Sequence, residues 1–145
     1  MNANIKPSEQ LAVLDVIPPS AQAAGVATTA WVPAGVALRL MALIQIGALG
    51  ASATVDAKVQ QAKDVAGTGA KDVTGAAIVQ HTVGNNKECL INVDPGVVDV
   101  EGGFNFVQLS VTVGVATTPT SAVLLAVGER YQPAAQAASV TQTIG

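Results

Sequence analysis

Charged side chains are scarce in this chain of 145 residues. Asp, Glu, Lys and Arg make up 12% of it, against about 25% in ordinary soluble domains. Because charge keeps the surfaces of small proteins apart, a surface this poor in charge predicts that other chains cover much of it. The formal net charge is −3, so the chain lacks the basic patch that nucleic-acid binding requires, and we expect no nucleic-acid partner.

Aromatic residues, cysteine and histidine are also rare. Phe, Trp and Tyr together make up 3% of the chain, so Val, Ala, Leu and Ile must build the core. A single cysteine, Cys89, excludes an internal disulfide framework, and its alternating neighbours predict a small buried side chain. A catalytic site needs a nucleophile, a base and an orienting group together, and the sequence offers only its single histidine, His81, for these roles. We therefore expect neither an enzyme nor a bound cofactor or metal.

Two stretches resemble ligand sites only superficially. Residues 67–71 are rich in glycine and end in Lys71, but they lack the Gly-Lys-Ser/Thr ending of a phosphate loop, so they predict a hairpin turn. Asp94, Asp99 and Glu101 lie near Gly-containing turns, where carboxylates can bind Ca²⁺. No EF-hand spacing is present, and loop solvation is the preferred interpretation.

The longest apolar run, residues 36–47, has two interpretations. A membrane helix needs about 20 mainly apolar residues, but the wider segment 31–51 is interrupted by Pro33, Arg39, Gln45, Gly47 and Gly50. A strand fits better, because alternate positions from Leu38 to Ile46 are uniformly apolar while the other face mixes polar and apolar residues. We therefore predict a central strand and no membrane partner.

Short alternating segments follow one another along the rest of the chain. We predict strands over residues 11–17, 26–32, 36–47, 53–63, 73–83, 87–94, 104–116 and 121–128. Alternation places residues 53, 55, 57 and 59 on one face of a half-buried strand, and residues 107, 109, 111, 113 and 115 on the buried face of another. Pro18 and Pro19 are expected to end the first strand, and Pro119 to break the chain before the last. For residues 53–63 a helix is the alternative, since Ala, Lys and Gln favour it. About eight short strands predict an all-β, antiparallel sandwich resembling a jelly roll.

The ends differ in composition from the middle. Residues 1–10 are polar, contain no apolar segment of the kind found in a secretory signal, and predict an extended N-terminal arm. Residues 11–131 form the sandwich domain. Residues 132–145, rich in Ala, Gln, Thr and Ser without periodicity, predict an extended C-terminal tail.

A few residues are candidates for contact with a partner. Trp31 and Tyr131 are the only Trp and Tyr, and aromatic side chains with a polar tip favour interfaces. Trp31 fits the core equally well, whereas Tyr131 follows Arg130 at the edge of the domain. Ile5 and Pro133, which belong to the two terminal segments, complete the predicted contacts.

Several segments together resemble a known class of protein. They are residues 47–50 leading into 53–62, residues 67–75, residues 103–113, and the ending of the domain over 128–133. In these segments the chain resembles the small head decoration, or cement, proteins of tailed bacteriophages and phage-like particles. The resemblance covers about residues 25–133 and implies a β-sandwich bound to a capsid.

The resemblance also implies a function and a location. The chain would bind the outside of the capsid, after assembly in the cytoplasm of the bacterial host, and cement contacts between capsomers of the major capsid protein. A symmetric homodimer, with a trimer as the alternative, would cover an edge or face of the sandwich. The other function considered is a carbohydrate- or receptor-binding module on a virion or cell surface.

Overall fold

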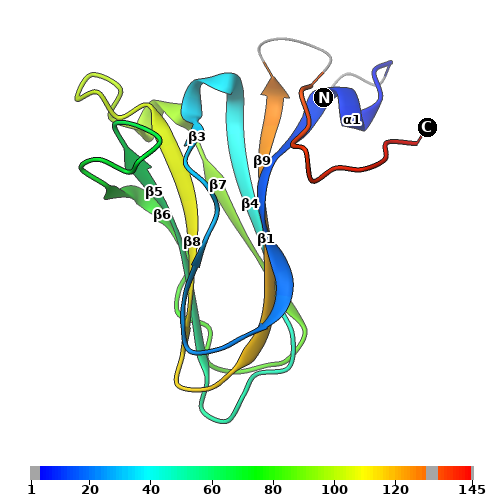
Figure 1. Ribbon diagram of the computed structural model, residues 1–145, viewed down its shortest axis with the longest axis vertical. Coiled ribbons are helices and arrows are strands. Elements are labelled where there is room, and N and C mark those ends of the chain that lie inside the picture. The colour runs from blue at the N-terminus through cyan, green and yellow to red at the C-terminus, as the bar shows by residue number, and fades with distance from the viewer. Residues whose placement is uncertain (1–3, 130–133, 145) are drawn as a thin grey trace.

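Two antiparallel β-sheets packed face to face make up the molecule (Figure 1). The computed structural model describes residues 4–129 and 134–144. One sheet has four strands in the order β1-β9-β4-β7. The other has five, in the order β2-β8-β5-β6 with β3 also paired to β8. The predicted all-β sandwich is confirmed.

The strands are β1 (Leu11–Gln22), β2 (Gly25–Thr28), β3 (Val32–Pro33), β4 (Ala37–Ile46), β5 (Thr54–Ala62), β6 (Lys71–Ala77), β7 (Lys87–Val93), β8 (Phe106–Gly114) and β9 (Thr118–Glu129). Helical structure in the described residues is confined to single turns: α1 (Pro7–Gln10) and the 3₁₀ turns η1 (Ala34–Val36) and η2 (Pro95–Val97). None of the helices in residues 4–129 and 134–144 is long and apolar enough to cross a membrane.

The strand order is that of a jelly roll. Both β2 and β3 pair with β8 and occupy the predicted strand 26–32, so they count as one interrupted strand. The eight resulting strands have the orders 1-8-3-6 in one sheet and 2-7-4-5 in the other, which are two interleaved Greek keys. The two last strands of the chain are interior strands of their sheets. β9 lies between β1 and β4, and β8 lies between β2 and β5, so each joins strands from earlier in the sequence.

The core lies between the sheets and is built mainly from aliphatic side chains. Its largest fully buried side chains include Leu40 and Ile44 of β4, Leu109 of β8 and Leu124 of β9. Each occupies an alternate position of a strand, as the period of two requires. The alternate positions 53, 55, 57 and 59 are all buried, and the last three lie in β5, so this segment is a strand and not a helix.

The prolines do not end strands as predicted. β1 continues through Pro18 and Pro19 to Gln22, with a register shift against β9 between Ile17 and Ser20. A bulge of this kind leaves residues out of the ladder, so their missing N–H groups cost no hydrogen bond. Pro119 likewise lies inside β9, paired with Ala21, and its carbonyl accepts a hydrogen bond of 2.8 Å from the Gly47 amide.

Alternation also failed at two residues predicted to be buried. Leu38 is 59% exposed, because the burial pattern breaks between Ala37 and Leu40 at the start of β4. Val115 is 72% exposed and has a φ of 69°, so the chain leaves the extended conformation and the side chain turns away from the core. The predicted strand 73–83 is shorter as well: β6 ends at Ala77, and only His81 pairs again, with Val55.

Candidate docking surface

The outer face of the four-stranded sheet is largely apolar. Its side chains alternate with buried ones along each strand, so Met41 and Leu43 of β4 point away from the core that contains Leu40, Ala42 and Ile44. The same alternation applies to β9, β1 and β7. We call this surface the apolar face, and its side chains are Leu11, Val13, Val16, Met41, Leu43, Leu90, Val123, Leu125 and Val127.

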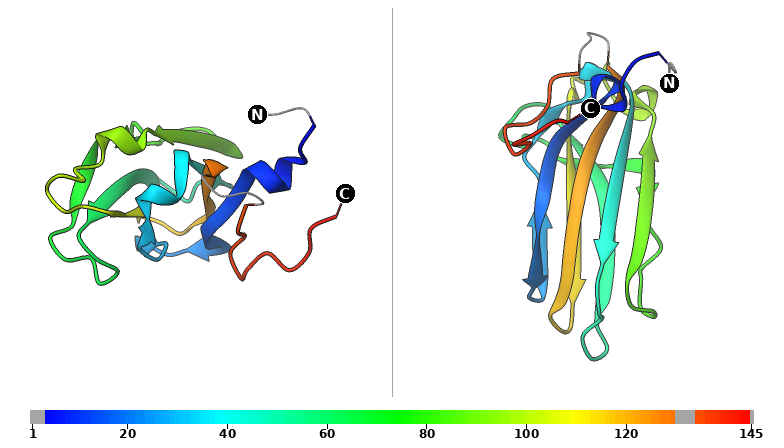
Figure 2. Two further views of the ribbon diagram at one scale, coloured as in Figure 1. Left: turned by 90° about the horizontal axis from the view of Figure 1, so that it is seen from above. Right: turned by 90° about the vertical axis from the view of Figure 1, so that its right-hand side faces the viewer.

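The strand register aligns these side chains in rows across the sheet. One row runs from Val13 through Leu125 to Met41. The next runs from Val16 through Val123 and Leu43 to Leu90, which is 60% exposed. The four strands lie side by side in the right-hand view of Figure 2. The rows therefore form a continuous apolar surface rather than scattered residues.

The outer face of the five-stranded sheet is polar by contrast. Lys58 of β5 donates to Asp72 of β6 at 3.0 Å, and Gln60 donates to the same carboxylate at 2.9 Å. These bonds lower the pKa of Asp72, with the Lys58 hydrogen bond as the largest cause. Val26, 61% exposed, is an apolar exception on this face. The sandwich thus has one hydrated face and one apolar face.

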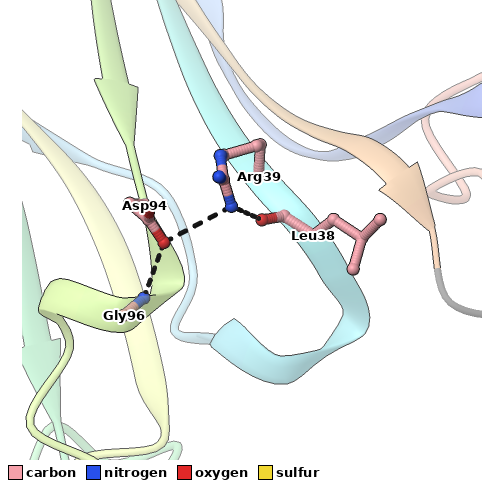
Figure 3. A network of polar contacts seen from close by, with 4 residues as sticks. All are labelled: Leu38, Arg39, Asp94 and Gly96. Carbon is pink, nitrogen blue, oxygen red and sulfur yellow. Dashed lines mark hydrogen bonds and ion pairs between the residues drawn. The ribbon is translucent and has the colours of Figure 1, made fainter.

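A positive group lies at the upper end of the apolar face (Figure 3). The Arg39 guanidinium lies 3.5 Å from Asp94 and donates to the Leu38 carbonyl at 2.8 Å. Asp94 also accepts from the Gly96 amide at 2.9 Å, which caps η2. Arg39 and Asp94 are exposed, with 64% and 53% of their side chains accessible, so their ion pair is weak and Arg39 remains available to a partner.

The lower end of the face is polar and carries a negative group. Glu88 of β7 pairs in register with Gln45 of β4, which accepts from the Ser121 hydroxyl at 3.1 Å. These residues line an open hollow of about 510 Å³ that runs between Pro19 and Pro119 and reaches the buried Thr120. The apolar rows therefore lie between a cation at one end and a carboxylate at the other.

Residues from both ends of the chain meet at the exposed edge of β1. The Gln136 side chain accepts from the Val13 amide at 2.8 Å and donates to the carbonyls of Leu11 at 2.6 Å and Ser8 at 2.9 Å. The Ala137 amide donates to the Val13 carbonyl at 2.9 Å. These bonds occupy edge groups that would otherwise offer a template for another strand. We call α1 and residues 134–144 the terminal corner.

Of the predicted contact residues, two lie in the described part of the chain. Ile5 is half-buried next to α1, at the terminal corner, where the Gln10 side chain donates to its carbonyl at 3.0 Å. Trp31 is half-buried with its indole against Gly67. Arg130, Tyr131 and Pro133 lie outside the described residues.

The structure gives local roles to the other residues that sequence analysis considered. His81 contacts the Gly84 carbonyl at 2.8 Å, and Cys89 is half-buried against the core. The Lys71 ammonium, 2.7 Å from Asp99, holds the pKa of that carboxyl below its ordinary value; it also lies 4.0 Å from the centroid of the Phe104 ring. Among the described residues, no group of three His, Cys, Asp or Glu side chains is placed to hold a metal.

The glycine-rich segment is a turn, as predicted. Asp64 accepts from the amides of Ala66 at 2.9 Å and Thr68 at 3.1 Å and so closes the loop between β5 and β6. Hydrogen bonds from Thr68 are the largest cause of the lowered pKa of Asp64. The amides of Ala66 and Thr68 thus bind a carboxylate of the chain itself.

Comparison with known proteins shows similarity in fold only. No protein-family model matches the chain, and no curated protein sequence matches it. A chain in the cryo-EM structure of Broad Bean Stain Virus is 12% identical with a TM-score of 0.42, over 71% of this chain and 59% of the viral one. The family 22 carbohydrate binding module of Clostridium thermocellum Xyn10B is 17% identical with a TM-score of 0.42, over 87% and 89% of the two chains. Xylanase 10C of Cellvibrio japonicus is 10% identical with a TM-score of 0.36, over 88% and 28%.

Proposed function

We propose that this chain is a structural virion protein that binds the outside of a phage capsid and cements contacts between capsomers of the major capsid protein. The observation that carries the proposal is the contrast between the two outer faces of the sandwich. An apolar face left in water costs about 25 cal/mol for each Å², so a chain with such a face is built to be covered. A component of an assembly meets that requirement.

The sequence supports a capsid as the assembly. The resemblance to phage head decoration proteins covers the strands from β2 to β9, and the scarcity of charge agrees with a surface shared with other chains. Assembly would take place in the cytoplasm of the bacterial host, where the heads of such phages are built. The shell of the head is the partner, and no chemical step is required of the chain.

The terminal corner is the proposed contact with the major capsid protein. Residues 138–144 extend beyond the bonds of Gln136 and Ala137 and are mostly exposed, and Ile144 is 89% exposed. An exposed segment of this kind can add to a strand edge of a neighbouring subunit. If two copies act together, their two corners reach two capsomers, and tethering raises the effective concentration of the second contact.

A deletion tests the role of the corner. Removing residues 138–145 leaves Gln136 and its three hydrogen bonds in place, so the sandwich should keep its melting temperature. We expect the truncated protein to lose its binding to heads made from a genome that lacks the gene, measured by co-sedimentation. Ile144→Ser should weaken binding in the same direction, whereas Val65→Ser, at a valine that is 69% exposed in the β5–β6 turn, should not.

Two results would contradict the proposal. Full occupancy of the heads by the truncated protein would show that residues 138–145 of the terminal corner do not make the contact. Failure of the intact protein to bind such heads at all would remove the capsid as its partner.

A surface-binding module for carbohydrate or a receptor is the second candidate. The open hollow at the lower end of the apolar face favours it, because Ser20, Gln45 and Glu88 present polar groups between two prolines. Sugar sites also use aromatic platforms, and Trp31 packs on Gly67 instead. A hit on a glycan array that Gln45→Ala abolishes would favour this candidate, and an array without hits would leave the capsid proposal.

A further inference from the structure

We infer that the free edge of β7 receives an extended segment of the major capsid protein as an added strand of the four-stranded sheet. The inference rests on the proposed function, because it supplies the second contact that a protein bridging two capsomers needs. The terminal corner lies beside β1 at one edge of this sheet, and β7 forms the opposite edge (Figure 2). One molecule can therefore hold two neighbours at opposite edges of one sheet.

The hydrogen-bond pattern of the sheet leaves alternate residues of β7 without a strand partner. The Gly47 amide donates to the Pro119 carbonyl at 2.8 Å, in register with the β4–β9 ladder. Because alternate residues of a strand bond to opposite sides, odd-numbered residues of β4 bond to β9 and even-numbered ones to β7. The even-numbered residues of β4 pair with odd-numbered residues of β7. The backbone groups that point away from the sheet are those of Glu88, Leu90 and Asn92.

The opposite edge of the sheet is closed by the chain itself. The Val13 amide and carbonyl point away from β9, where they bind the Gln136 side chain at 2.8 Å and the Ala137 amide at 2.9 Å. Within residues 4–129 and 134–144, no such bond reaches the outward amides and carbonyls of β7. The chain thus covers one edge of the sheet and leaves the other open.

The two edges of the five-stranded sheet are poor templates for an added strand. At one edge β2 has four residues and β3 has two, and residues 29–31 separate them. At the other edge β6 shifts its register against β5 between Lys58 and Gln60. By contrast, β7 pairs with β4 over seven consecutive residues without a shift, and it contains neither glycine nor proline. Since natural proteins usually block so regular an edge, its openness indicates that a strand binds there.

The side chains of β7 define the strand that fits. Toward the core, Ile91 and Val93 are buried and Cys89 is half-buried, so the added strand needs apolar side chains on its inner face. On the outer face Leu90 is 60% exposed, and Glu88 forms no ion pair with any residue that the structure describes. Main-chain bonds give such a contact its affinity and alternate side chains its specificity. The segment is therefore extended, apolar on its inner face, and carries a Lys or Arg level with Glu88.

A second copy of β7 fits this edge less well. Antiparallel pairing of two copies about Leu90 would place Asn92 of one copy opposite Glu88 of the other. Asp94 of the first copy would then occupy the diagonal position next to the same Glu88, and diagonal neighbours interact across a pair of strands. The two-fold symmetry would form this repulsive contact twice. A segment of another protein, with a basic side chain at that position, avoids the repulsion.

Two proline variants test the inference by co-sedimentation with heads made from a genome that lacks the gene. Leu90→Pro blocks an added strand but keeps the ladder to β4, because proline is tolerated where the N–H faces solvent. We expect its binding to fall by about tenfold or more, since one of two tethered contacts is lost. Val26→Pro is the matched control and should bind normally. Val26 is 61% exposed on the edge strand β2, and its amide points outward because the Thr29 amide bonds to β8.

Amide hydrogen exchange tests the same edge without any substitution. In the free protein the amides of Glu88, Leu90 and Asn92 should exchange faster than those of Cys89 and Ile91, which bond to β4. After binding to the heads, the three outward amides should become protected as well. Exchange on the heads, quenched and read by NMR after dissociation, measures this alternation.

The outcomes separate this inference from the proposed function. Equal binding of the wild type and Leu90→Pro would overturn the inference and leave the proposed function in place, whereas an intact protein that does not bind the heads would overturn both. Fast exchange at outward amides that persists on the heads would also overturn the inference. So would a dimer of the isolated chain that Leu90→Pro abolishes, because a second copy would then occupy the edge. If circular dichroism shows Leu90→Pro unfolded, Glu88→Lys takes its place, and unchanged binding of that variant would count against the inference.

Discussion

Thr118 and Thr120 lie two positions apart on β9, and both are buried, with exposures of 0% and 4%. The Thr118 hydroxyl accepts from the Gly50 amide at 3.2 Å and donates to the Ala116 carbonyl at 3.3 Å. Within the described residues, the Thr120 hydroxyl is the buried side-chain group without a hydrogen-bond partner. Two chemically identical residues on one strand therefore make different contributions to stability.

The pair gives a prediction with its own control. Thr120→Val removes an unsatisfied hydroxyl and keeps the shape of the side chain, so the free energy of unfolding should stay level or rise by up to about 1 kcal/mol. Thr118→Val leaves the Gly50 amide and the Ala116 carbonyl without that partner and should lower it by about 1–3 kcal/mol. Urea denaturation of both variants measures the difference, and equal changes would contradict it.

For single residues, the alternation of the sequence predicted burial correctly only where the backbone stays extended. The alternation rule placed Val107, Leu109, Val111 and Val113 in the core correctly. It failed at Val115 because a positive φ reverses the direction of the side chain. A valine gives no sign of a positive φ in the sequence, because this conformation is unfavourable for it.

Among the elements, β9 shows how a single strand serves two surfaces. Leu124 is fully buried between the sheets, and its neighbour Leu125 lies in the apolar face. The two leucines are adjacent on one strand, and they differ because successive side chains point to opposite faces of the sheet.

Truncation of each leucine should separate the two functions of β9. Leu124→Ala creates a cavity in the core and should lower the free energy of unfolding by about 2–5 kcal/mol. Leu125→Ala should cost the isolated protein less than half as much, but it should weaken binding to the heads. Denaturation at low protein concentration, together with co-sedimentation, compares them; similar losses of stability would show that the apolar face is already packed within one chain.

The edge of β1 depends on one side chain from the far end of the sequence. Gln136→Leu keeps the length of the side chain and removes all three of its hydrogen bonds to the β1 edge and Ser8. We expect faster amide exchange at Val13 and a loss of about 1–3 kcal/mol in the free energy of unfolding. Gln142→Leu, at an exposed position of the same segment, is the control, and equal protection of the Val13 amide in the wild type and in Gln136→Leu would contradict the assignment.

Sequence analysis located most strands but could not pair them. The mixed face of residues 36–47 was recognisable, including Met41 and Leu43, yet its meaning depends on β9, β1 and β7 lying beside it. Those neighbours come from distant parts of the chain, and their register is fixed by packing rather than by any local motif. The predicted strand ends at the prolines were wrong for a related reason. Whether the missing N–H of a proline costs a hydrogen bond depends on its register with the partner strand, which the sequence does not show.

For the whole molecule, docking on the shell couples stability to binding. A ligand that binds only the folded state raises the melting temperature by mass action, and the proposed shell is such a ligand. We expect the melting temperature of the wild-type chain to rise when heads are added in excess, by several degrees for a domain of this size. Scanning calorimetry with and without heads measures this, with the protein that lacks residues 138–145 as a variant whose melting temperature should stay constant.

The terminal corner has a practical consequence for the opposite end of the sandwich (Figure 1). Both described ends of the chain gather at the top of the fold, while the turn between β4 and β5 lies at the bottom, with Ala51 and Ser52 exposed at its tip. A foreign epitope spliced between Ala51 and Ser52 would stand a full strand length away from any anchoring terminus. The fold thus offers a display platform whose cargo and whose attachment do not compete for space.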